Sequence, residues 1–260
     1  MNLMKQANTT HDTSCQQCRE SHQLDFDFTM AFQPIVHYPS QQIFGYEALV
    51  RGLNNEPAYT IISQLNDQNR YRFDQLCRVK AIALAAELKL PGMLSINFLP
   101  NAVYRPERCI RTTLEAAEKY QFPIQQIMFE FIETEQVTDT QHIKNIVAHY
   151  QQLGFKTAID DFGAGYSNLN LLADFQTDIV KLDMALIRNI DKDPARQTIL
   201  RHSVAMFNEL NVTVLAEGIE SRQEMLFLHD CGVELMQGYY FAKPGFQSLP
   251  KVDFSQLGSH

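Results

Sequence analysis

The chain has 260 residues, of which 45% are hydrophobic, and it carries a formal net charge of −8. This length suits one large barrel or two small domains, and the apolar fraction is enough to fill a sizeable core. General binders of nucleic-acid backbones are basic, so the composition argues against DNA or RNA polymers as partners, whereas a small anionic substrate is compatible with cations lying between it and the chain.

No stretch reaches the roughly 18 consecutive apolar residues that a membrane span needs. The polar start MNLMKQANTTHDTSC also lacks the apolar centre of a signal peptide. The five cysteines are odd in number and scattered along the chain, which does not indicate a disulfide framework. We therefore expect reduced thiols, no membrane partner and a cytoplasmic location.

Residues 1–27 are polar and irregular, and we interpret them as a flexible lead with a possible Cys/His sensor role. His11, Cys15, Cys18 and His22 follow the order H-x3-C-x2-C-x3-H, and four such ligands could bind Zn²⁺ or respond to redox state. No apolar residues surround them to build a small core, so the alternative is a polar segment with incidental cysteines. Arg19 after Cys18 excludes a c-type haem attachment site.

Short β-type runs alternate with helical runs over residues 28–250, and residues 251–260 form a weakly patterned tail. The strand candidates end near Val36, Val50, Phe98, Phe131, Asp160, Leu182, Glu217 and Met236. Apolar side chains at helical spacing predict helices around residues 73–88, 143–153 and 200–210. Strands that alternate with helices favour a parallel sheet, and eight of them favour closure into an α/β, TIM-like (β/α)8 barrel.

The first two strand candidates, residues 28–36 and 43–50, are separated by a connection that is too short for a helical crossover. Antiparallel strands can be joined by a short turn, whereas parallel strands need a dozen or so connecting residues. We therefore predict an irregular barrel whose first strand is antiparallel.

Acids and amides recur where the predicted strands end, which is where barrel enzymes place their chemistry. These residues, with one lysine among them, are Glu47, Asn97, Glu130, Glu133, Asp160, Asp161, Lys181, Glu217 and Gln237. Any one of them alone would more often be a solvated loop residue or a helix cap. Together, so many acids on one rim repel one another unless cations lie among them.

The donor types indicate which metal such a rim would bind. The candidate ligands are oxygen donors, and no histidine or cysteine stands at a predicted strand end, which suits Mg²⁺ or Mn²⁺ rather than Zn²⁺. Adjacent Asp160 and Asp161 could share two ions, an arrangement used for phosphodiester displacement. Lys181 could orient a water or offset charge on the phosphate, and Arg51 could bind a non-reacting phosphate.

The motifs resemble those of the EAL domain family, and the likeness runs from about Phe28 to Pro244. Glu47-Ala48-Leu49 resembles the signature that names the family, and Asn97 stands in a segment similar to its asparagine motif. The remaining motifs follow in the family's order: Glu130-Phe131-Ile132-Glu133, Asp160-Asp161-Phe162-Gly163, Lys181-Leu182-Asp183, Glu217-Gly218-Ile219-Glu220 and Gln237-Gly238-Tyr239.

The resemblance implies hydrolysis of cyclic di-GMP to linear 5′-pGpG by two Mg²⁺ or Mn²⁺ ions, with Ca²⁺ as an inhibitor, in bacterial second-messenger signalling. One ion would be held by Glu47, Asn97, Glu130 and Asp160, and the other by Asp160, Asp161 and Glu217. Lys181, Glu133 and Glu217 would have catalytic roles, with Glu133 steadying the DDFG loop at the interface of a homodimer. Leu49, Arg51 and Gln237 would line the substrate groove. One departure is Ile132, where the family often has threonine.

Three other functions compete with this interpretation. An EAL domain that has lost metal ligands can act as a cyclic di-GMP receptor without cleaving it, but every proposed ligand is present here. A barrel glycosidase could use Glu130 and Glu217, yet the chain has no Trp for a sugar platform. A Schiff-base aldolase would need a neutral Lys181, and surrounding acids raise a lysine's pKa rather than lower it.

Overall fold

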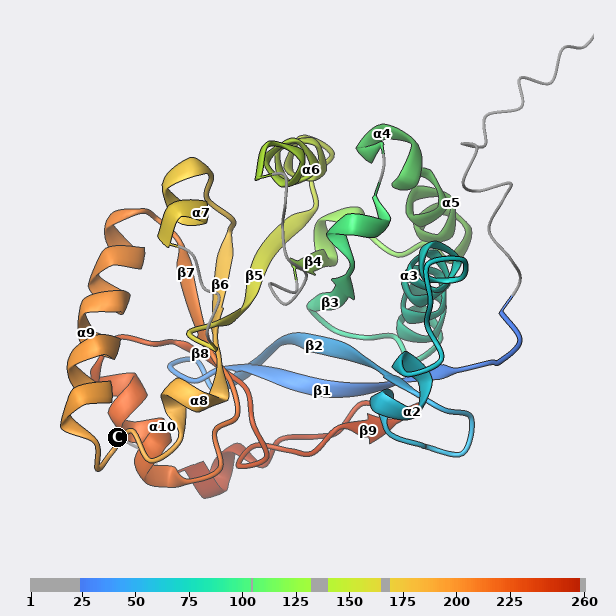
Figure 1. The fold of residues 1–260 in the computed structure, drawn as a ribbon. Coiled ribbons are helices and arrows are strands. Elements are labelled where there is room, and N and C mark those ends of the chain that lie inside the picture. Colours follow the sequence, from blue (N-terminus) through green and yellow to red (C-terminus); the bar gives the residue numbers. More distant parts are fainter. Residues whose placement is uncertain (1–23, 104, 132–139, 165–168, 258–260) are drawn as a thin grey trace, which may run out of the picture.

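The computed structural model describes residues 24–103, 105–131, 140–164 and 169–257. Eight strands form a closed barrel with helices around it, and a short ninth strand lies beside the first (Figure 1). The strands are β1 (Thr29–His37), β2 (Gln42–Arg51), β3 (Met93–Phe98), β4 (Ile127–Phe131), β5 (Lys156–Phe162), β6 (Ile179–Leu182), β7 (Thr213–Ala216), β8 (Leu235–Met236) and β9 (Gly245–Phe246).

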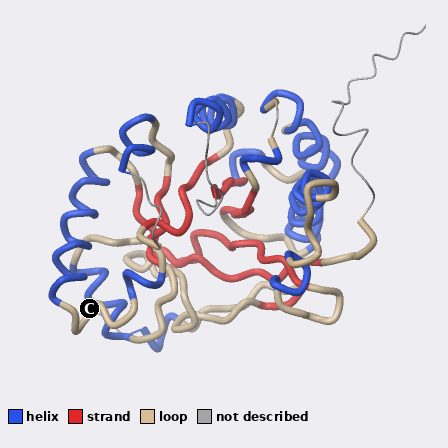
Figure 2. The backbone as a smooth tube through the Cα atoms, in the orientation of Figure 1, coloured by secondary structure: helices blue, strands red, loops and turns tan. Residues whose placement is uncertain are grey.

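The helices lie around the barrel, and Figure 2 shows them outside the central strands. They are α2 (Ala58–Ile62), α3 (Arg70–Glu87), α4 (Pro106–Cys109), α5 (Arg111–Tyr120), α6 (Thr140–Gln152), α7 (Leu169–Asp174), α8 (Met184–Ile187), α9 (Pro194–Glu209) and α10 (Arg222–Asp230), with 3-10 turns η1 (Pro100–Ala102), η2 (Ile124–Gln126) and η3 (Phe254–Leu257). No helix within these described ranges has both the length and the apolar character needed to cross a membrane.

The predicted helices form where their apolar faces can be buried. Ile143, Ile146 and Val147 of α6 face the core, as the spacing predicted. α9 begins at Pro194 behind the side-chain cap of Asp193 and buries its predicted face. It ends one residue before Leu210, which was expected on that face but caps the helix and is 37% exposed.

The strand order is β2-β3-β4-β5-β6-β7-β8-β1, and pairing of β1 with β2 closes the barrel. Successive strands from β2 to β8 are parallel, whereas β1 is antiparallel to both of its barrel neighbours. The predicted barrel with an antiparallel first strand is therefore confirmed. β1 ends at His37, one residue later than expected, and its reversed direction puts that end at the rim opposite the strand ends that carry the acids.

The turn between β1 and β2 leaves no crossover helix to cover this flank, and the C-terminal segment covers it instead (Figure 1). β9, which the sequence did not predict, pairs with β1 at Ala31 and Phe32. The Tyr46 hydroxyl donates a hydrogen bond to the carbonyl of Pro250 at 3.1 Å, and Leu249 packs on the core that contains Tyr46.

Candidate active site

The site is the polar layer directly above the apolar filling of the barrel. Side chains two positions apart on a strand share a face. The filling consists of Ile35, Met128, Ala158, Ile179, Leu215 and Leu235. Two positions after members of this set come Glu130, Asp160, Lys181, Glu217 and Gln237. On antiparallel β1 the order is reversed, so that Gln33, two positions before Ile35, joins the layer opposite Glu47.

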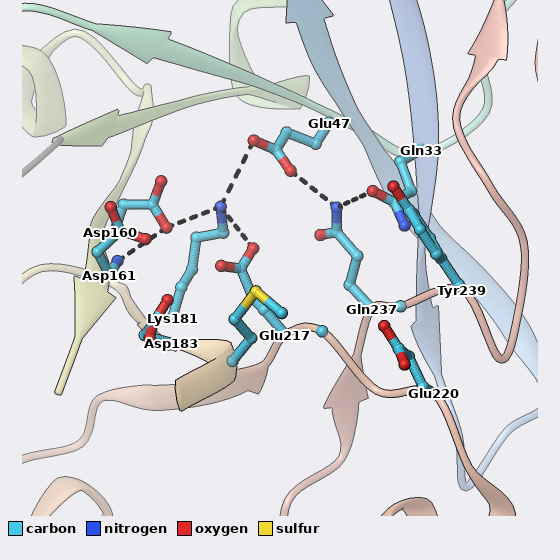
Figure 3. A pocket seen from close by; sticks show the side chains of 13 residues that line it. Gln33, Glu47, Asp160, Asp161, Lys181, Asp183, Glu217, Glu220, Gln237 and Tyr239 are labelled. Carbon is cyan, nitrogen blue, oxygen red and sulfur yellow. Dashed lines mark hydrogen bonds and ion pairs between the residues drawn. The ribbon is translucent and has the colours of Figure 1, made fainter. Parts of the chain in front are cut away.

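A β-bulge in β5 explains how two adjacent aspartates reach the same site. In a regular strand, neighbouring side chains point to opposite faces. The pairing of β5 with β6 shifts register between Ile159 and Phe162, and Asp161 has a positive φ of 56°. An irregularity of this kind re-aims a side chain. Asp160 and Asp161 consequently both line the cavity (Figure 3).

Lys181 lies at the centre of the acids, and Figure 3 shows its ammonium group pointing toward Glu47, Asp160 and Glu217. Its Nζ is 2.8 Å from Glu217 Oε1, 2.9 Å from Glu130 Oε2 and 3.0 Å from Asp160 Oδ1. Glu47 Oε1 is further away, at 3.7 Å. The lysine is 1% exposed, so one buried cation forms ion pairs with four carboxylates.

The pKa values of these groups reflect their burial first and the charges around them second. Burial raises the pKa of Glu130 and of Glu217 well above the usual range, and neighbouring acids add to the rise against the attraction of Lys181. Burial also works to raise the pKa of Glu47, but Lys181 and hydrogen bonds from Gln237 and Asn97 leave it lowered. Burial, followed by the charge of Asp160, raises the pKa of Asp161 to about 6.

Two groups of carboxylates are arranged so that each could hold a metal ion. Glu47, Glu130 and Asp160 form one group, and Asp160, Asp161 and Glu217 form the other, with ligand atoms within 4.8 Å of one another in each. The donors are oxygens, Asp160 is common to both groups, and four carboxylates surround the single ammonium group of Lys181. This donor set fits two hard divalent cations such as Mg²⁺ or Mn²⁺.

A chain of amides holds Glu47 in place. Asn97 Nδ2 donates to Glu47 Oε1 at 2.8 Å, and Gln237 Nε2 donates to Glu47 Oε2 at 2.7 Å and to Gln33 Oε1 at 3.3 Å. Gln33 in turn donates to the carbonyl of Ala242 at 3.2 Å. The Oε1 atom of Gln237 is buried and accepts no hydrogen bond from the residues that the structure describes.

The cavity above these groups measures about 350 Å³. Its wall includes several residues that were not predicted as site residues: Gln33, Asp183, Met184, Gly218, Glu220, Gly238 and Tyr239. A glutamine inside the apolar run Met30–Val36 was a signal for Gln33, but the strand-end rule directed attention to the wrong end of an antiparallel strand. Met184 and Tyr239, which line this cavity, are 46% and 56% exposed.

Other predicted site residues lie apart from the cavity or outside the described ranges. Arg51 ends β2 and donates through Nη1 to the carbonyl of Val50 at 2.7 Å. Within the described chain, neither Arg51 nor Leu49 is among the residues that line the cavity. Glu133, together with Ile132, lies outside the described residues, as does the cysteine pair proposed for Zn²⁺.

The family model described as the EAL domain matches residues 17–244. The Blue light- and temperature-regulated antirepressor BluF of Escherichia coli (strain K12) is 30% identical over 223 residues, which are 85% of this chain and 55% of the relative. The Cyclic di-GMP phosphodiesterase PdeR of the same organism is 38% identical over 140 residues, which are 51% of this chain and 21% of the relative. The chain thus spans about half the length of the first relative and less of the second.

Solved structures match the fold over most of this chain. A standalone versatile EAL protein from Vibrio cholerae O395, in a c-di-GMP bound form, is 68% identical with a TM-score of 0.87, and the match covers 90% of this chain and 99% of that one. The manganese/cy-diGMP complex of Klebsiella pneumoniae BlrP1 is 32% identical with a TM-score of 0.80, covering 88% of this chain and 58% of that one.

Proposed function

This chain belongs to the EAL domain family, and from that premise we propose that it is a metal-dependent phosphodiesterase that hydrolyses cyclic di-GMP to linear 5′-pGpG. The observation that carries the proposal is the pair of oxygen-ligand groups that share Asp160, with Lys181 between them. The relative called a cyclic di-GMP phosphodiesterase and the c-di-GMP and manganese named in the solved structures support the same substrate and metal class.

The candidate ligands fall into two sets, one for each proposed metal ion. Glu47, Asn97, Glu130 and Asp160 would hold one ion, and Asp160, Asp161 and Glu217 would hold the other. Bound there, two divalent cations would supply an activated water and neutralise charge on the phosphate. Ca²⁺ prefers longer bonds and more ligands than Mg²⁺, which is consistent with the expectation that it inhibits.

Lys181 is the charged group best placed to act on the phosphate. Burial works to lower its pKa, but Asp160, Glu130, Glu217 and Glu47 outweigh that effect and raise the pKa well above its usual value. The side chain therefore stays protonated and can donate hydrogen bonds to an attacking water or to a phosphate oxygen as negative charge develops.

The remaining assignments concern the substrate. We infer that Gln237 offers its buried Oε1 to the substrate, and that Leu49 and Arg51 line the groove beyond the cavity. Two further assignments concern the assembly and the location of the chain. Glu133 and the DDFG loop would contribute to a homodimer interface, which light scattering coupled to size-exclusion chromatography tests.

Cys77, Cys109 and Cys231 are free thiols, which supports a cytoplasmic location.

The deciding experiment is incubation of the purified chain with cyclic di-GMP in Mg²⁺, Mn²⁺ or Ca²⁺, and again with excess chelator, followed by chromatography of the products. We expect 5′-pGpG with Mg²⁺ and Mn²⁺ only. The Glu47→Ala variant is the matched control for a contaminating nuclease. Equal product with and without chelator would contradict the metal-dependent reaction.

A receptor that binds cyclic di-GMP without cleaving it is the second candidate. The relative named as an antirepressor favours it, as does the pairing of Lys181 with four carboxylates, which lowers the repulsion among them without added metal. Tight binding of cyclic di-GMP by calorimetry, with no product in Mg²⁺ or Mn²⁺, would establish this function instead.

A further inference from the structure

A buried ion pair lies on the outer side of the barrel wall, away from the proposed reaction. Arg78 Nη2 of helix α3 donates to Asp74 Oδ2 at 2.6 Å, and the two side chains are 0% and 1% exposed. An ion pair removed from water this completely is a weak source of stability, because desolvation offsets the attraction. The contacts that the pair makes with the barrel wall are therefore a better guide to its role than its net stability.

The second carboxylate oxygen of Asp74 reaches the end of strand β3. Asp74 Oδ1 accepts a hydrogen bond from the backbone N–H of Leu99 at 3.0 Å. Leu99 is the first residue after β3 and lies two positions beyond Asn97. The carboxylate thereby ties helix α3 to the strand end that carries Asn97, whose amide donates to Glu47.

Arg78 braces the outer faces of two strands. Its guanidinium carbon lies 5.3 Å from the ring centre of Phe98 and 5.2 Å from that of Phe129. Nη1 donates to the hydroxyl of Tyr150 in α6 at 3.2 Å. Because neighbouring side chains point to opposite faces of a strand, the residues next to these two rings, Asn97 and Glu130, face the interior.

Beside this strand end lies a mainly apolar cavity of about 270 Å³. Asp74, Asn97 and Leu99 are among the residues that line it, together with Ile62 and Leu65 from the α2 region. Atoms on the cavity side provide little packing against the end of β3. The hydrogen bond from Leu99 to Asp74 therefore adds a directional restraint to those that the pairing with β4 and the bond from the Ala102 amide to the Leu99 carbonyl provide.

We propose that Asp74 is a positioning residue for the metal ion that Glu47, Asn97, Glu130 and Asp160 would hold. It fixes the Leu99 amide and through it the direction of Asn97, while Arg78 holds the carboxylate in place. The inference deepens the proposed function and rests on its metal site. Replacing a residue that orients a metal ligand without contacting the metal typically lowers metal affinity by about 10- to 100-fold.

The test compares two double variants that both lack the charge pair. In D74N/R78M, the asparagine oxygen can still accept from Leu99, whereas in D74L/R78M no acceptor remains. Leucine and asparagine are similar in size, and removing both charges leaves no uncompensated ion in the core. Mn²⁺ binding to each purified chain is measured by electron paramagnetic resonance and by calorimetry, and thermal unfolding is recorded without metal.

We expect D74N/R78M to bind Mn²⁺ within a few-fold of the parent chain and D74L/R78M to bind it at least about tenfold more weakly. The same order is expected for the Mn²⁺ concentration that half-activates hydrolysis. A merely structural role predicts a lower midpoint of unfolding with equal Mn²⁺ affinity in the two variants, and that result would overturn the inference.

A second measurement needs no substitution. In the parent chain, the ¹⁵N–¹H signal of Leu99 should move on titration with Mg²⁺, while the amide of buried Leu200 in α9 should not. A Leu99 signal unmoved at saturating Mg²⁺ overturns the inference even if the variants fail to fold. If Mn²⁺ affinity depends on the acceptor at position 74 as expected but the parent chain makes no 5′-pGpG, only the phosphodiesterase is refuted.

Discussion

Replacement of Lys181 by Met removes the cation that separates four carboxylates, of which those of Glu47, Glu130 and Asp160 are buried. Its Nζ lies within 3.0 Å of three of them and 3.7 Å from the fourth. Breaking a buried ion pair by removing one partner costs about 3–5 kcal/mol. For a chain of this size, each kcal/mol shifts the midpoint of thermal unfolding by about 2–4 °C. We therefore expect the midpoint to fall by roughly 10 °C when it is measured in the presence of a chelator.

The loss should depend on pH and on metal in a defined way. Glu130 and Glu217 have raised pKa values in the folded chain, and removing Lys181 raises them further. Folded carboxylates then bind protons more tightly than unfolded ones, so stability increases as the pH falls through their folded pKa. The loss of stability in the variant should therefore become smaller as the pH is lowered. Excess Mg²⁺ should also reduce this loss, because it binds only the folded state.

The assay is differential scanning fluorimetry of parent and variant in chelator and in Mg²⁺, at a series of pH values from about 5 to about 8. Lys156→Met is the matched control, because Lys156 also forms a close ion pair, 2.7 Å from Asp178, but is 53% exposed. An exposed pair contributes about 0–1 kcal/mol. A Lys181 defect that is independent of both pH and Mg²⁺ would refute carboxylate repulsion as its cause.

Three further changes test the proposed site. Glu47→Ala should lower kcat/KM for cyclic di-GMP by at least about 100-fold because it removes a ligand, and near-parental turnover would contradict the two-ion assignment. Arg51→Ala should raise KM about tenfold or more with little change in kcat, because it removes a phosphate contact, and an unchanged KM would argue against that contact. Because the Asp161 pKa is about 6, protons should compete with Mn²⁺ below that pH, and calorimetry should show binding weakening on acidification; constant affinity would exclude Asp161 as a ligand.

Much of the fold followed from spacing alone. A run such as Lys156–Phe162 has apolar residues before its acids and can form a buried strand wherever it lies in a parallel barrel. The antiparallel first pair was predictable because the chain between Val36 and Ile43 has no room for a helix. β9 was missed because its two residues, Gly245 and Phe246, carry no periodic signal. They pair with β1 beyond the point where β8 ends, since β8 pairs only with Val36 and His37.

The site was predictable where its residues end parallel strands, and less so elsewhere. The acids and Lys181 came from one rule about strand ends, applied to each strand in turn. Gln33 escaped it, because its strand runs the other way. The pair Asp74 and Arg78 also escaped, since a charged residue on a helix is usually solvated and only the packed structure reveals that both are buried.

The way the barrel closes has a consequence for its folding. β1, the first strand of the barrel, pairs with β2 but also with β8 and β9, which follow it by about 200 residues in the sequence. A nascent chain lacking those late strands can form its first hairpin but exposes one edge and one flank of it. Completion of the barrel must therefore await synthesis of β8 and β9, and contacts between such distant segments also form slowly. Until they form, the open edge of β1 is available for aggregation.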